Sequence, residues 1–323
     1  MGKYSIHSDL KKYEQFKFKL NPGLLPVINT VLAILLKTKK NAKGIIATKK
    51  KISGYQNALI DLVVYEPETI GKNAPCLMYL HGGAFALKAA AHHKYLIGEY
   101  AVKTPCKVVF VDYRLAPRHA FPVAAEDCYA AFEWIGNHAD ALGIDPGRIA
   151  VGGDSAGGAL AAAVTHMARD RKSPFGICYQ MLIYPVTDAR MTTQIMKNYT
   201  DTPVWDSRLN AQMWSMYLRD GDHGMRAYAS PMEAASFENL PNAYVEVSEF
   251  DCLRDEGIAY AQALEKNGCR VIFNKTAGTV HGFEVAEKCG LTCKCVVERI
   301  DALQNAFCTK AMAEEPKDSI SLA

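Results

Sequence analysis

The chain has 323 residues, of which 49% are hydrophobic and 22% are charged, an ordinary composition for a globular protein with a large core. The formal net charge of +3 is too small to indicate nucleic-acid binding by itself, so we expect no nucleic-acid partner. The charge is uneven, however. Residues 1–51 are rich in lysine, contain no arginine and hold only two acids, Asp9 and Glu14.

The first long apolar run, residues 24–36, begins too late for a signal peptide and is too short to span a bilayer. With no secretory signal before its ten scattered cysteines, we expect a cytoplasmic protein whose cysteines are reduced and act mostly as small core residues. Cys289, Cys293 and Cys295 lie close together, but they lack CxxC spacing and a nearby histidine pair. They therefore favour helix packing over a zinc site.

The apolar residues of 24–36 recur at helical spacing and go round most of the predicted helix. We expect this helix to be covered on more than one side, within an N-terminal cap segment, residues 1–44, over the carboxyl edge of a sheet. Residues 44–54 and 58–68 then predict two strands, the second closed by Pro67.

After residue 75, short apolar runs alternate with longer helical stretches. Strands are predicted at 76–80, 106–113, 148–153, 177–185, 242–250 and 269–275. Helices are predicted at 92–103, 122–138, 156–170, 255–267 and 283–309. The alternation predicts an α/β fold with a mostly parallel, doubly wound sheet, which is the architecture of an α/β-hydrolase fold with a helical cap.

The stretch 189–229 breaks this alternation, because it is rich in tryptophan and methionine and contains no clear strand. We interpret it as a cap insertion over the carboxyl edge of the sheet, where ligands bind in open α/β folds. The catalytic domain is then expected to comprise residues 45–188 and 230–312, followed by a C-terminal tail, residues 313–323.

A glycine-rich motif, Gly153 to Gly157, fits G-x-S-x-G and stands where a strand meets a helix. In that context the motif is a nucleophile elbow: the turn lifts the hydroxyl of Ser155 clear of the sheet, and the glycines let strand and helix approach. A glycine-rich loop could produce the pattern by chance. A phosphate-binding loop is excluded, because no Lys-Ser or Lys-Thr follows.

Upstream, "YLHGGAF" (79–85) follows a predicted strand, and its adjacent glycines can turn two backbone N–H groups toward one point. A serine nucleophile also needs a base and an acid that orients it, in the order Ser, Asp, His in α/β-hydrolases. Three histidines lie downstream of Ser155: His166, His223 and His281. We favour His281, since it lies between the last predicted strand and the last helix.

Two aspartates end predicted strands between Ser155 and His281. Asp251 ends the strand next to the one that precedes His281, and Asp188 ends the strand before that. We favour Asp251 as the acid, with Asp188 as the alternative.

Several motifs occur in an order that resembles the hormone-sensitive-lipase-like family of α/β-hydrolases, which includes bacterial carboxylesterases and acetyl esterases. They are "HGGA" (81–84), "DYRLAP" (112–117), "FPVAAEDCYAAFEWI" (121–135), "DPGRIAVGGDSAGG" (145–158), "FDCLRDEG" (250–257) and "HGF" (281–283). The resemblance implies Ser155 as nucleophile, Asp251 as acid and His281 as base. It also implies an oxyanion hole made by the N–H groups of Gly82, Gly83 and Ala156.

The sequence departs from the family pattern at two positions. Ala84 stands where H-G-G-G is usual, and its methyl group is expected to narrow the acyl pocket. Arg118 stands after "YRLAP", where the family usually has an acid. The second departure concerns a local ion pair and leaves the catalytic prediction unchanged.

The resemblance implies a serine carboxylesterase that acts on a small-molecule ester, preferably a short-chain, acetyl-type ester, with no cofactor and no metal. An amidase or formamidase with the same triad is an alternative. A membrane-associated lipase is another, suggested by the lysines beside 24–36, but this run is short and lacks tryptophan, so we do not expect membrane association. A binding module is disfavoured because His281 is present. A homodimer is compatible with the sequence.

Overall fold

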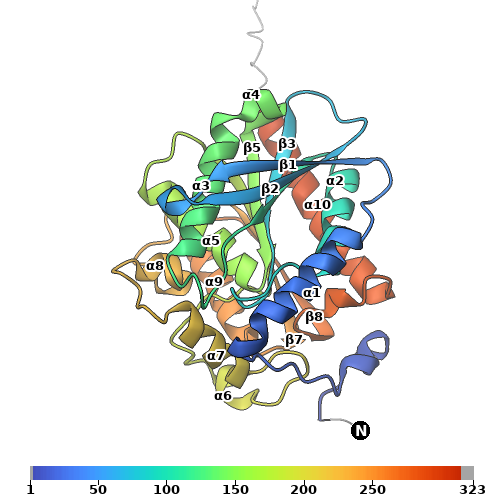
Figure 1. The fold of residues 1–323 in the computed structure, drawn as a ribbon, viewed down its shortest axis with the longest axis vertical. Helices are drawn as coiled ribbons and strands as arrows, with labels where there is room; N and C mark the ends of the chain where they lie inside the picture. Colours follow the sequence, from blue (N-terminus) through green and yellow to red (C-terminus); the bar gives the residue numbers. More distant parts are fainter. Residues whose placement is uncertain (1–2, 314–323) are drawn as a thin grey trace, which may run out of the picture.

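The computed structural model describes residues 3–313, with side chains described through residue 308, so most of the predicted tail lies outside the described residues. An eight-stranded sheet in the order β1-β2-β4-β3-β5-β6-β7-β8 forms the centre (Figure 1). The strands are β1 (Ile45–Ser53), β2 (Leu59–Pro67), β3 (Ala74–Leu80), β4 (Lys107–Asp112), β5 (Ile144–Asp154), β6 (Ile177–Ile183), β7 (Ala243–Phe250) and β8 (Val271–Val280). β1 and β2 pair antiparallel, as do β2 and β4, and the remaining pairs are parallel. The predicted α/β-hydrolase fold class is therefore confirmed.

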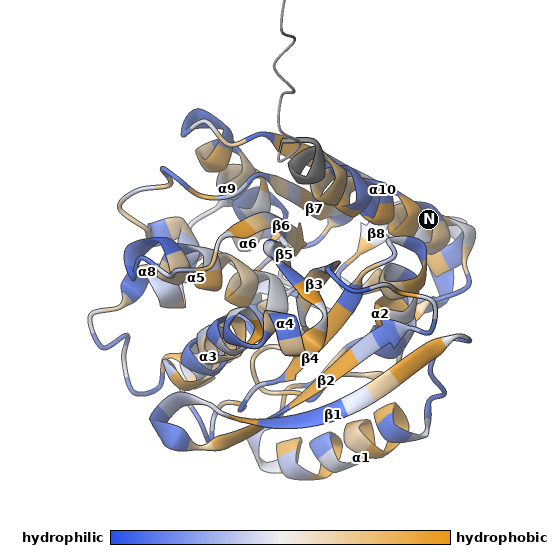
Figure 2. Ribbon diagram, turned by 90° about the horizontal axis from the view of Figure 1, so that it is seen from above, coloured by the Kyte–Doolittle hydropathy of each residue, from blue (hydrophilic) through white to orange (hydrophobic). Residues whose placement is uncertain are grey.

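Helices cover both faces of the sheet, and each face has its own hydrophobic core (Figure 2). One face is packed by α3 (Val123–Asn137), α5 (Ala156–Asp170) and α9 (Arg254–Lys266). The other is packed by α2 (Ala91–Lys103) and α10 (Gly290–Ala313). The short helix α4 (Ala139–Leu142) leads into β5. Because both faces are covered, the central parallel strands read as continuous apolar runs.

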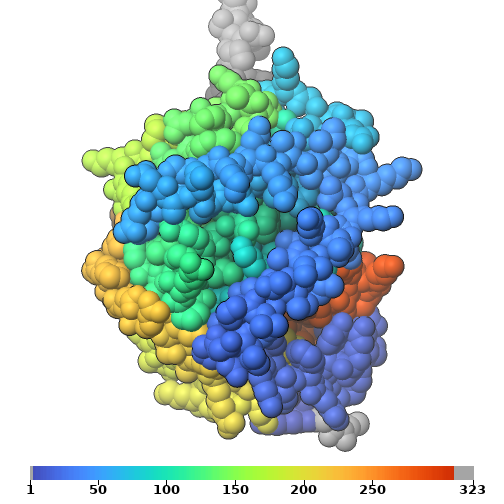
Figure 3. Space-filling model, viewed as in Figure 1, coloured from blue at the N-terminus to red at the C-terminus, as the bar shows by residue number. Residues whose placement is uncertain are grey.

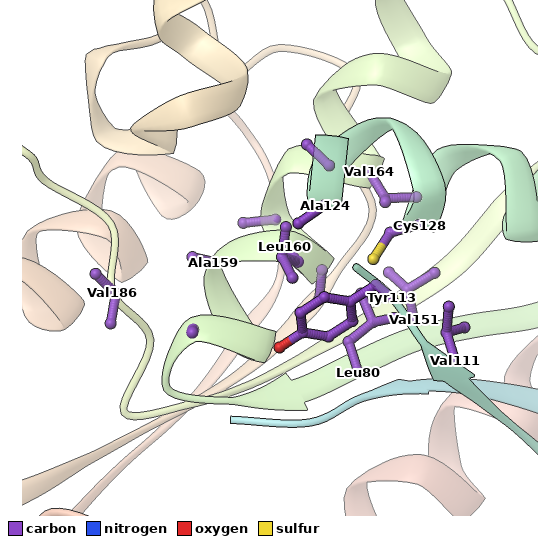
Figure 4. Close-up of a cluster of buried hydrophobic side chains, with 14 of the residues drawn as sticks. Leu80, Val111, Tyr113, Ala124, Cys128, Val151, Ala159, Leu160, Val164 and Val186 are labelled. Carbon is purple, nitrogen blue, oxygen red and sulfur yellow. The ribbon is translucent and has the colours of Figure 1, made fainter. Parts of the chain in front are cut away.

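The core under α3 and α5 is shown in Figure 4. Leu80, Val111 and Val151 point from three adjacent strands toward Leu160 and neighbouring small side chains of the two helices. Small residues predominate on α5, where every residue from Ala156 to Ala168 is buried. They allow this helix to lie close against the sheet and fix where it begins, which is directly after β5.

Two glycines permit the closest approach in this region. A Cβ atom at Gly153 would lie 2.2 Å from the carbonyl oxygen of Leu80, and one at Gly157 would lie 2.0 Å from the same oxygen. Backbone atoms cannot move aside as a flexible side chain can. The turn between β5 and α5 therefore packs directly on the end of β3, which brings the segment after β3 beside Ser155.

Two segments outside the alternating pattern lie near the carboxyl ends of the strands. Between β6 and β7 the chain forms α6 (Gln194–Asn198), α7 (Ser207–Tyr217) and α8 (Arg226–Ala229). Before β1 it forms α1 (Leu25–Thr38), which runs across the front of the molecule in Figure 1. Short 3-10 turns lie at Ser8–Tyr13, Pro22–Leu24, Tyr55–Asn57, Pro231–Glu233 and Phe283–Val285. None of the helices within residues 3–313 has the length and apolar character needed to cross a bilayer.

The expectation that the helix in residues 24–36 is covered on more than one side is wrong. Leu25 is the one residue of α1 that is fully buried. The apolar side chains on the opposite side are 49% to 63% exposed; they are Leu24, Val27, Val31, Ile34 and Leu35. The helix packs through a single face, and no other described segment covers its outer face.

Two boundaries near the end of the chain also differ from the prediction. β8 continues to Val280, because polar residues in its second half find partners inside the protein: Thr276 donates to the Val247 carbonyl and pairs with Thr279. The last helix begins at Gly290 instead of residue 283. Gly282, with φ of 65°, turns the chain away from helical geometry directly after His281.

Candidate active site

Ser155 occupies the single residue between β5 and α5. Its backbone has φ of 55° and ψ of −120°, a conformation that L-residues seldom adopt. Such strain persists only where the surroundings hold it in place, and here the Ser155 N–H donates to the Ile183 carbonyl at 2.8 Å. The hydroxyl is thereby presented at the carboxyl edge of the sheet, and the N-terminus of α5 begins at the next residue.

The three residues predicted as a triad lie within hydrogen-bond distance of one another. His281 Nε2 lies 2.8 Å from Ser155 Oγ, and His281 Nδ1 lies 2.6 Å from Asp251 Oδ2. Asp251 also accepts a hydrogen bond from the Leu253 N–H at 3.0 Å, which fixes the orientation of its carboxylate. Ser155 follows β5, Asp251 follows β7 and His281 follows β8. Because these strands are parallel, all three residues lie at the carboxyl edge of the sheet.

The environment of His281 makes its imidazole a stronger base. Burial by itself would lower the pKa of His281, but the charge and hydrogen bond of Asp251 outweigh burial, so the pKa lies above its ordinary value. Two aromatic rings hold the imidazole in place, Tyr184 at 4.6 Å and Trp205 at 5.9 Å between ring centroids. The ring is therefore positioned to accept a proton from Ser155 while Asp251 stabilises the resulting charge.

The alternative residues lie elsewhere. Asp188 is bound by Arg190, with Nε and Nη2 each 2.8 Å from its carboxylate. His166 is buried within α5, where it contacts the Tyr260 hydroxyl at 3.1 Å, and burial lowers its pKa to about 3. His223 is exposed in the insertion. None of the three forms a hydrogen bond with Ser155, Asp251 or His281.

Of the three expected oxyanion donors, the N–H groups of Gly83 and Ala156 have no partner among the described residues, whereas the N–H group of Gly82 does. The Gly82 N–H donates to Asp154 Oδ1 at 3.0 Å, so this predicted oxyanion donor already has a partner within the protein. Within residues 3–313, the N–H groups of Gly83, Ala84 and Ala156 donate to no other group. Gly83 has φ of 131° and Ala84 has φ of 57°, so the chain turns sharply here and redirects successive N–H groups.

Asp154 holds this loop against the nucleophile turn, a role that the sequence analysis missed. Besides the Gly82 N–H, its carboxylate accepts the Tyr79 hydroxyl at 2.8 Å and contacts His93 Nε2 at 3.2 Å. A Cβ atom at Gly82 would lie 2.2 Å from Asp154 Oδ2, so only glycine fits there. The position of Asp154 directly before Ser155 was a signal for its importance, but its partners lie far away in the sequence.

Asp154 and His93 form a buried ion pair. Burial would raise the pKa of Asp154, but the charge and hydrogen bond of His93 outweigh it and hold that pKa well below its usual range. Burial would lower the pKa of His93, and Asp154 reverses this effect and raises it. The pair links α2 to the turn that carries the nucleophile.

The insertion between β6 and β7 contributes aromatic rings that pack against His281 and against the loop after β3. Phe85 stacks on Tyr217 of α7 with ring centroids 3.8 Å apart, and it lies 6.0 Å from Trp214. Trp205 from the same insertion is the ring beside His281. Ser155 and His281 are both buried, with 6% and 7% of their surface exposed.

Within residues 3–313, no three His, Cys, Asp or Glu side chains are grouped so that they could hold a metal ion. In the predicted cysteine cluster, Cys289 Sγ lies 3.0 Å from the Thr292 hydroxyl, Cys293 is exposed and Cys295 is buried. All ten cysteines are unbridged.

The chain is similar to known esterases over most of its length. A family model described as the alpha/beta hydrolase fold matches residues 77–285. The chain is 38% identical to Esterase LipI of Mycobacterium tuberculosis over 223 residues, which are 68% of this chain and 69% of that protein. It is 34% identical to Carboxylesterase NlhH of the same species over 252 residues, 77% of this chain and 79% of that one.

Solved structures agree. The structure titled Bacterial Heroin Esterase superimposes with a TM-score of 0.86 at 31% identity, covering 94% of this chain and 98% of that one. The hyperthermophilic esterase from the archaeon Pyrobaculum calidifontis gives a TM-score of 0.80 at 33% identity, covering 94% and 96%. The chain belongs to the hormone-sensitive-lipase-like family of α/β-hydrolases, and it is a carboxylic ester hydrolase.

Proposed function

We propose that the protein hydrolyses short-chain carboxylic esters through an acyl-enzyme formed on Ser155. The observation that carries the proposal is the buried series of contacts from Ser155 Oγ to His281 Nε2 and from His281 Nδ1 to Asp251 Oδ2, at 2.8 and 2.6 Å. A hydroxyl, an imidazole and a carboxylate in this order are what nucleophilic acyl transfer needs.

The reaction proceeds in two halves. Ser155 Oγ attacks the ester carbonyl while His281 Nε2 takes the hydroxyl proton, and Asp251 holds the Nδ1–H tautomer and stabilises the imidazolium. His281 then gives the proton to the leaving alcohol, and the acyl group remains on Ser155. In the second half, water attacks the acyl-enzyme with the same histidine as base, which releases the carboxylic acid and restores the hydroxyl.

For the oxyanion we propose the N–H groups of Gly83, Ala84 and Ala156. They come from the turn after β3 and from the first residue of α5, and they donate to nothing else within residues 3–313. The N-terminus of a helix also favours negative charge. In a comparable site, removal of one such donor costs about 3 kcal/mol of transition-state stabilisation.

The preference for short acyl groups is supported by crowding around the nucleophile. Ala84 adds a methyl group where the resemblance leads us to expect glycine, and it is buried. Trp205 lies beside His281, and Phe85, next to Ala84 in the chain, is held by its stack on Tyr217. Acetyl to butyryl esters are therefore the expected substrates, and long-chain triglycerides are expected to react poorly.

The test combines covalent labelling with a substrate panel. A fluorophosphonate probe should add its mass to Ser155, and Ser155→Ala should abolish both the labelling and the hydrolysis of p-nitrophenyl acetate. The panel should run from acetyl to long-chain esters and include matched amides, because the same triad serves amidases. Labelling of another residue would contradict the mechanism, and faster cleavage of the amides or of the long-chain esters would contradict the substrate class.

A further inference from the structure

One stretch of the sequence contains many lysines and no acidic residue. From residue 15 to residue 60 there is no aspartate or glutamate. The same stretch contains nine lysines: Lys17, Lys19, Lys37, Lys39, Lys40, Lys43, Lys49, Lys50 and Lys51. The stretch includes all of α1 and β1, which both lie on the face of the molecule shown in Figure 3.

Most of these lysines form no ion pair with the described residues, 3–313. Lys39 binds Glu287 and Lys51 binds Asp61. By contrast, Lys37 in the last turn of α1 and Lys40 and Lys43 just after the helix are exposed and form no ion pair within residues 3–313. Their charge is therefore available to an external partner.

The outer face of α1 adds an apolar surface to this charge. Leu24, Val27, Val31 and Ile34 follow one another at intervals of three and four residues, so they form one stripe along the helix, with Leu35 beside it. These five residues, which we call the α1 stripe, are at least 49% exposed. A contiguous exposed stripe of large aliphatic side chains marks an interaction surface.

The inner face of α1 is fastened to the body of the protein, so the helix cannot turn to hide the stripe. Asn29 Nδ2 donates to the Ala86 carbonyl at 2.9 Å, and Asn29 Oδ1 accepts the Lys88 N–H at 2.8 Å. Just before the helix, the Gln212 side chain of α7 donates to the Leu20 carbonyl at 2.5 Å. The stripe therefore faces outward as a fixed feature of the fold.

The size and charge of this surface disfavour a second copy of the chain as the occupant. Stable protein interfaces use roughly 20–30 residues from each partner, far more than the α1 stripe offers. Two copies facing each other through α1 would also bring unpaired lysines together. The helix, at 14 residues, is also shorter than the roughly 20 residues that span a bilayer.

The sequence alone led us not to expect membrane association, but the exposed outer face of α1 reverses that expectation. We propose that the α1 stripe docks the protein on an anionic lipid surface. α1 lies in the plane of the interface, its aliphatic side chains enter the boundary between headgroups and acyl chains, and Lys37, Lys40 and Lys43 bind the acidic headgroups. Apolar insertion and electrostatic attraction together are what give interfacial helices their affinity. This inference concerns where the protein binds and does not depend on the proposed acyl preference.

The test is flotation of the full-length protein with vesicles, one part phosphatidylglycerol to two parts phosphatidylcholine, against vesicles of phosphatidylcholine alone. The stripe variant is V27S/V31S/I34S and the charge variant is K37Q/K40Q/K43Q. The matched control is K72Q/K172Q/K266Q, which removes the same charge from exposed lysines elsewhere. Circular dichroism and hydrolysis of a soluble acetyl ester show whether each variant is folded.

The wild-type protein and the control should float with the anionic vesicles and much less with neutral ones. The stripe and charge variants should each lose roughly 100-fold in partition coefficient, and ~0.5 M salt should weaken wild-type binding. Absence of wild-type binding, or binding that survives in the stripe variant, would overturn the proposal. A wild-type dimer that becomes a monomer in the stripe variant would instead make α1 a subunit contact.

Discussion

Gly82 donates its backbone N–H to Asp154 Oδ1 at 3.0 Å, so the residue before the nucleophile also holds the loop that follows β3. In an esterase site, the attacking serine and the N–H groups that bind the oxyanion must be held at a fixed position relative to each other. In this protein the buried carboxylate of Asp154 holds them in place, and His93 and Tyr79 fix the orientation of that carboxylate.

Replacement of Asp154 should therefore impair catalysis although the residue touches no substrate in the proposed mechanism. Asp154→Asn keeps an acceptor for Gly82 but leaves His93 without its anionic partner. We expect kcat to fall by roughly 10- to 100-fold, with KM changed less, and thermal stability to decrease. The matched control is Asp188→Asn, which alters another buried aspartate outside the triad. Equal kcat in the two variants would contradict the role given to Asp154.

The choice between Asp251 and Asp188 as triad acid can be decided directly. Asp251→Asn should lower kcat by about 10⁴-fold, because an amide favours the wrong imidazole tautomer. Asp188→Asn should be mild by comparison, since Asp188 binds Arg190 and not His281. Steady-state kinetics on p-nitrophenyl acetate measures both. The assignment fails if the order of the two effects is reversed.

The pH dependence follows from the raised pKa of His281. The base works only when neutral, so kcat/KM should rise with pH through a pKa above that of a free imidazole. In Asp251→Asn the charge that raises this pKa is gone while burial still lowers it. In this variant, the rise of the residual kcat/KM with pH should therefore occur at lower pH than in the wild-type protein. Profiles of kcat/KM between about pH 5 and pH 9 test this, and an unmoved limb would contradict it.

Ala84→Gly tests whether the methyl group at position 84 limits the acyl chain. One methyl group corresponds to about 0.8 kcal/mol of apolar contact, so the ratio of kcat/KM for hexanoyl over acetyl esters should rise by roughly fourfold. Because Ala84 has φ of 57°, glycine should not reduce thermal stability. An unchanged chain-length profile would mean that other residues limit the pocket.

Because the turn after β5 packs directly against the end of β3, we expect a side chain at Gly157 to destabilise the protein strongly. Gly157→Ala would place a Cβ atom 2.0 Å from the Leu80 carbonyl oxygen, whereas Gly158→Ala would place one 3.0 Å from a side-chain atom of Pro185. Gly157→Ala should cost about 3 kcal/mol in the free energy of unfolding, and Gly158→Ala clearly less. Urea unfolding followed by circular dichroism compares them. Similar losses would show that this turn can relax.

The sequence predicted the fold well, because the alternation of apolar runs and helical stretches depends on local composition. It also singled out Ser155, Asp251 and His281, since each falls at a strand end or in a recognisable motif. It could not show that the Gly82 N–H is already bound, because the direction of a backbone donor depends on the turn after β3 and on Asp154, 72 residues away.

The outer face of α1 illustrates a second limit. Periodicity showed that the helix is apolar round most of its circumference, but not which of its two apolar faces the protein covers. Leu25 turned inward and Val31 outward because Asn29 fixes the rotation of the helix through Ala86. A hydrogen bond between segments 57 residues apart leaves no local pattern to detect.

The two edges of the sheet are unequal, and this limits how the protein can associate through its strands. β1 forms one edge and carries Lys49, Lys50 and Lys51 in succession, a charge run that discourages pairing with another strand. β8 forms the other edge, where Ile272 and Phe273 are partly exposed. Because the β1 edge is protected, a strand of another molecule can pair with this sheet only at β8. Strand pairing between copies would therefore stop at two molecules and could not propagate into a fibre.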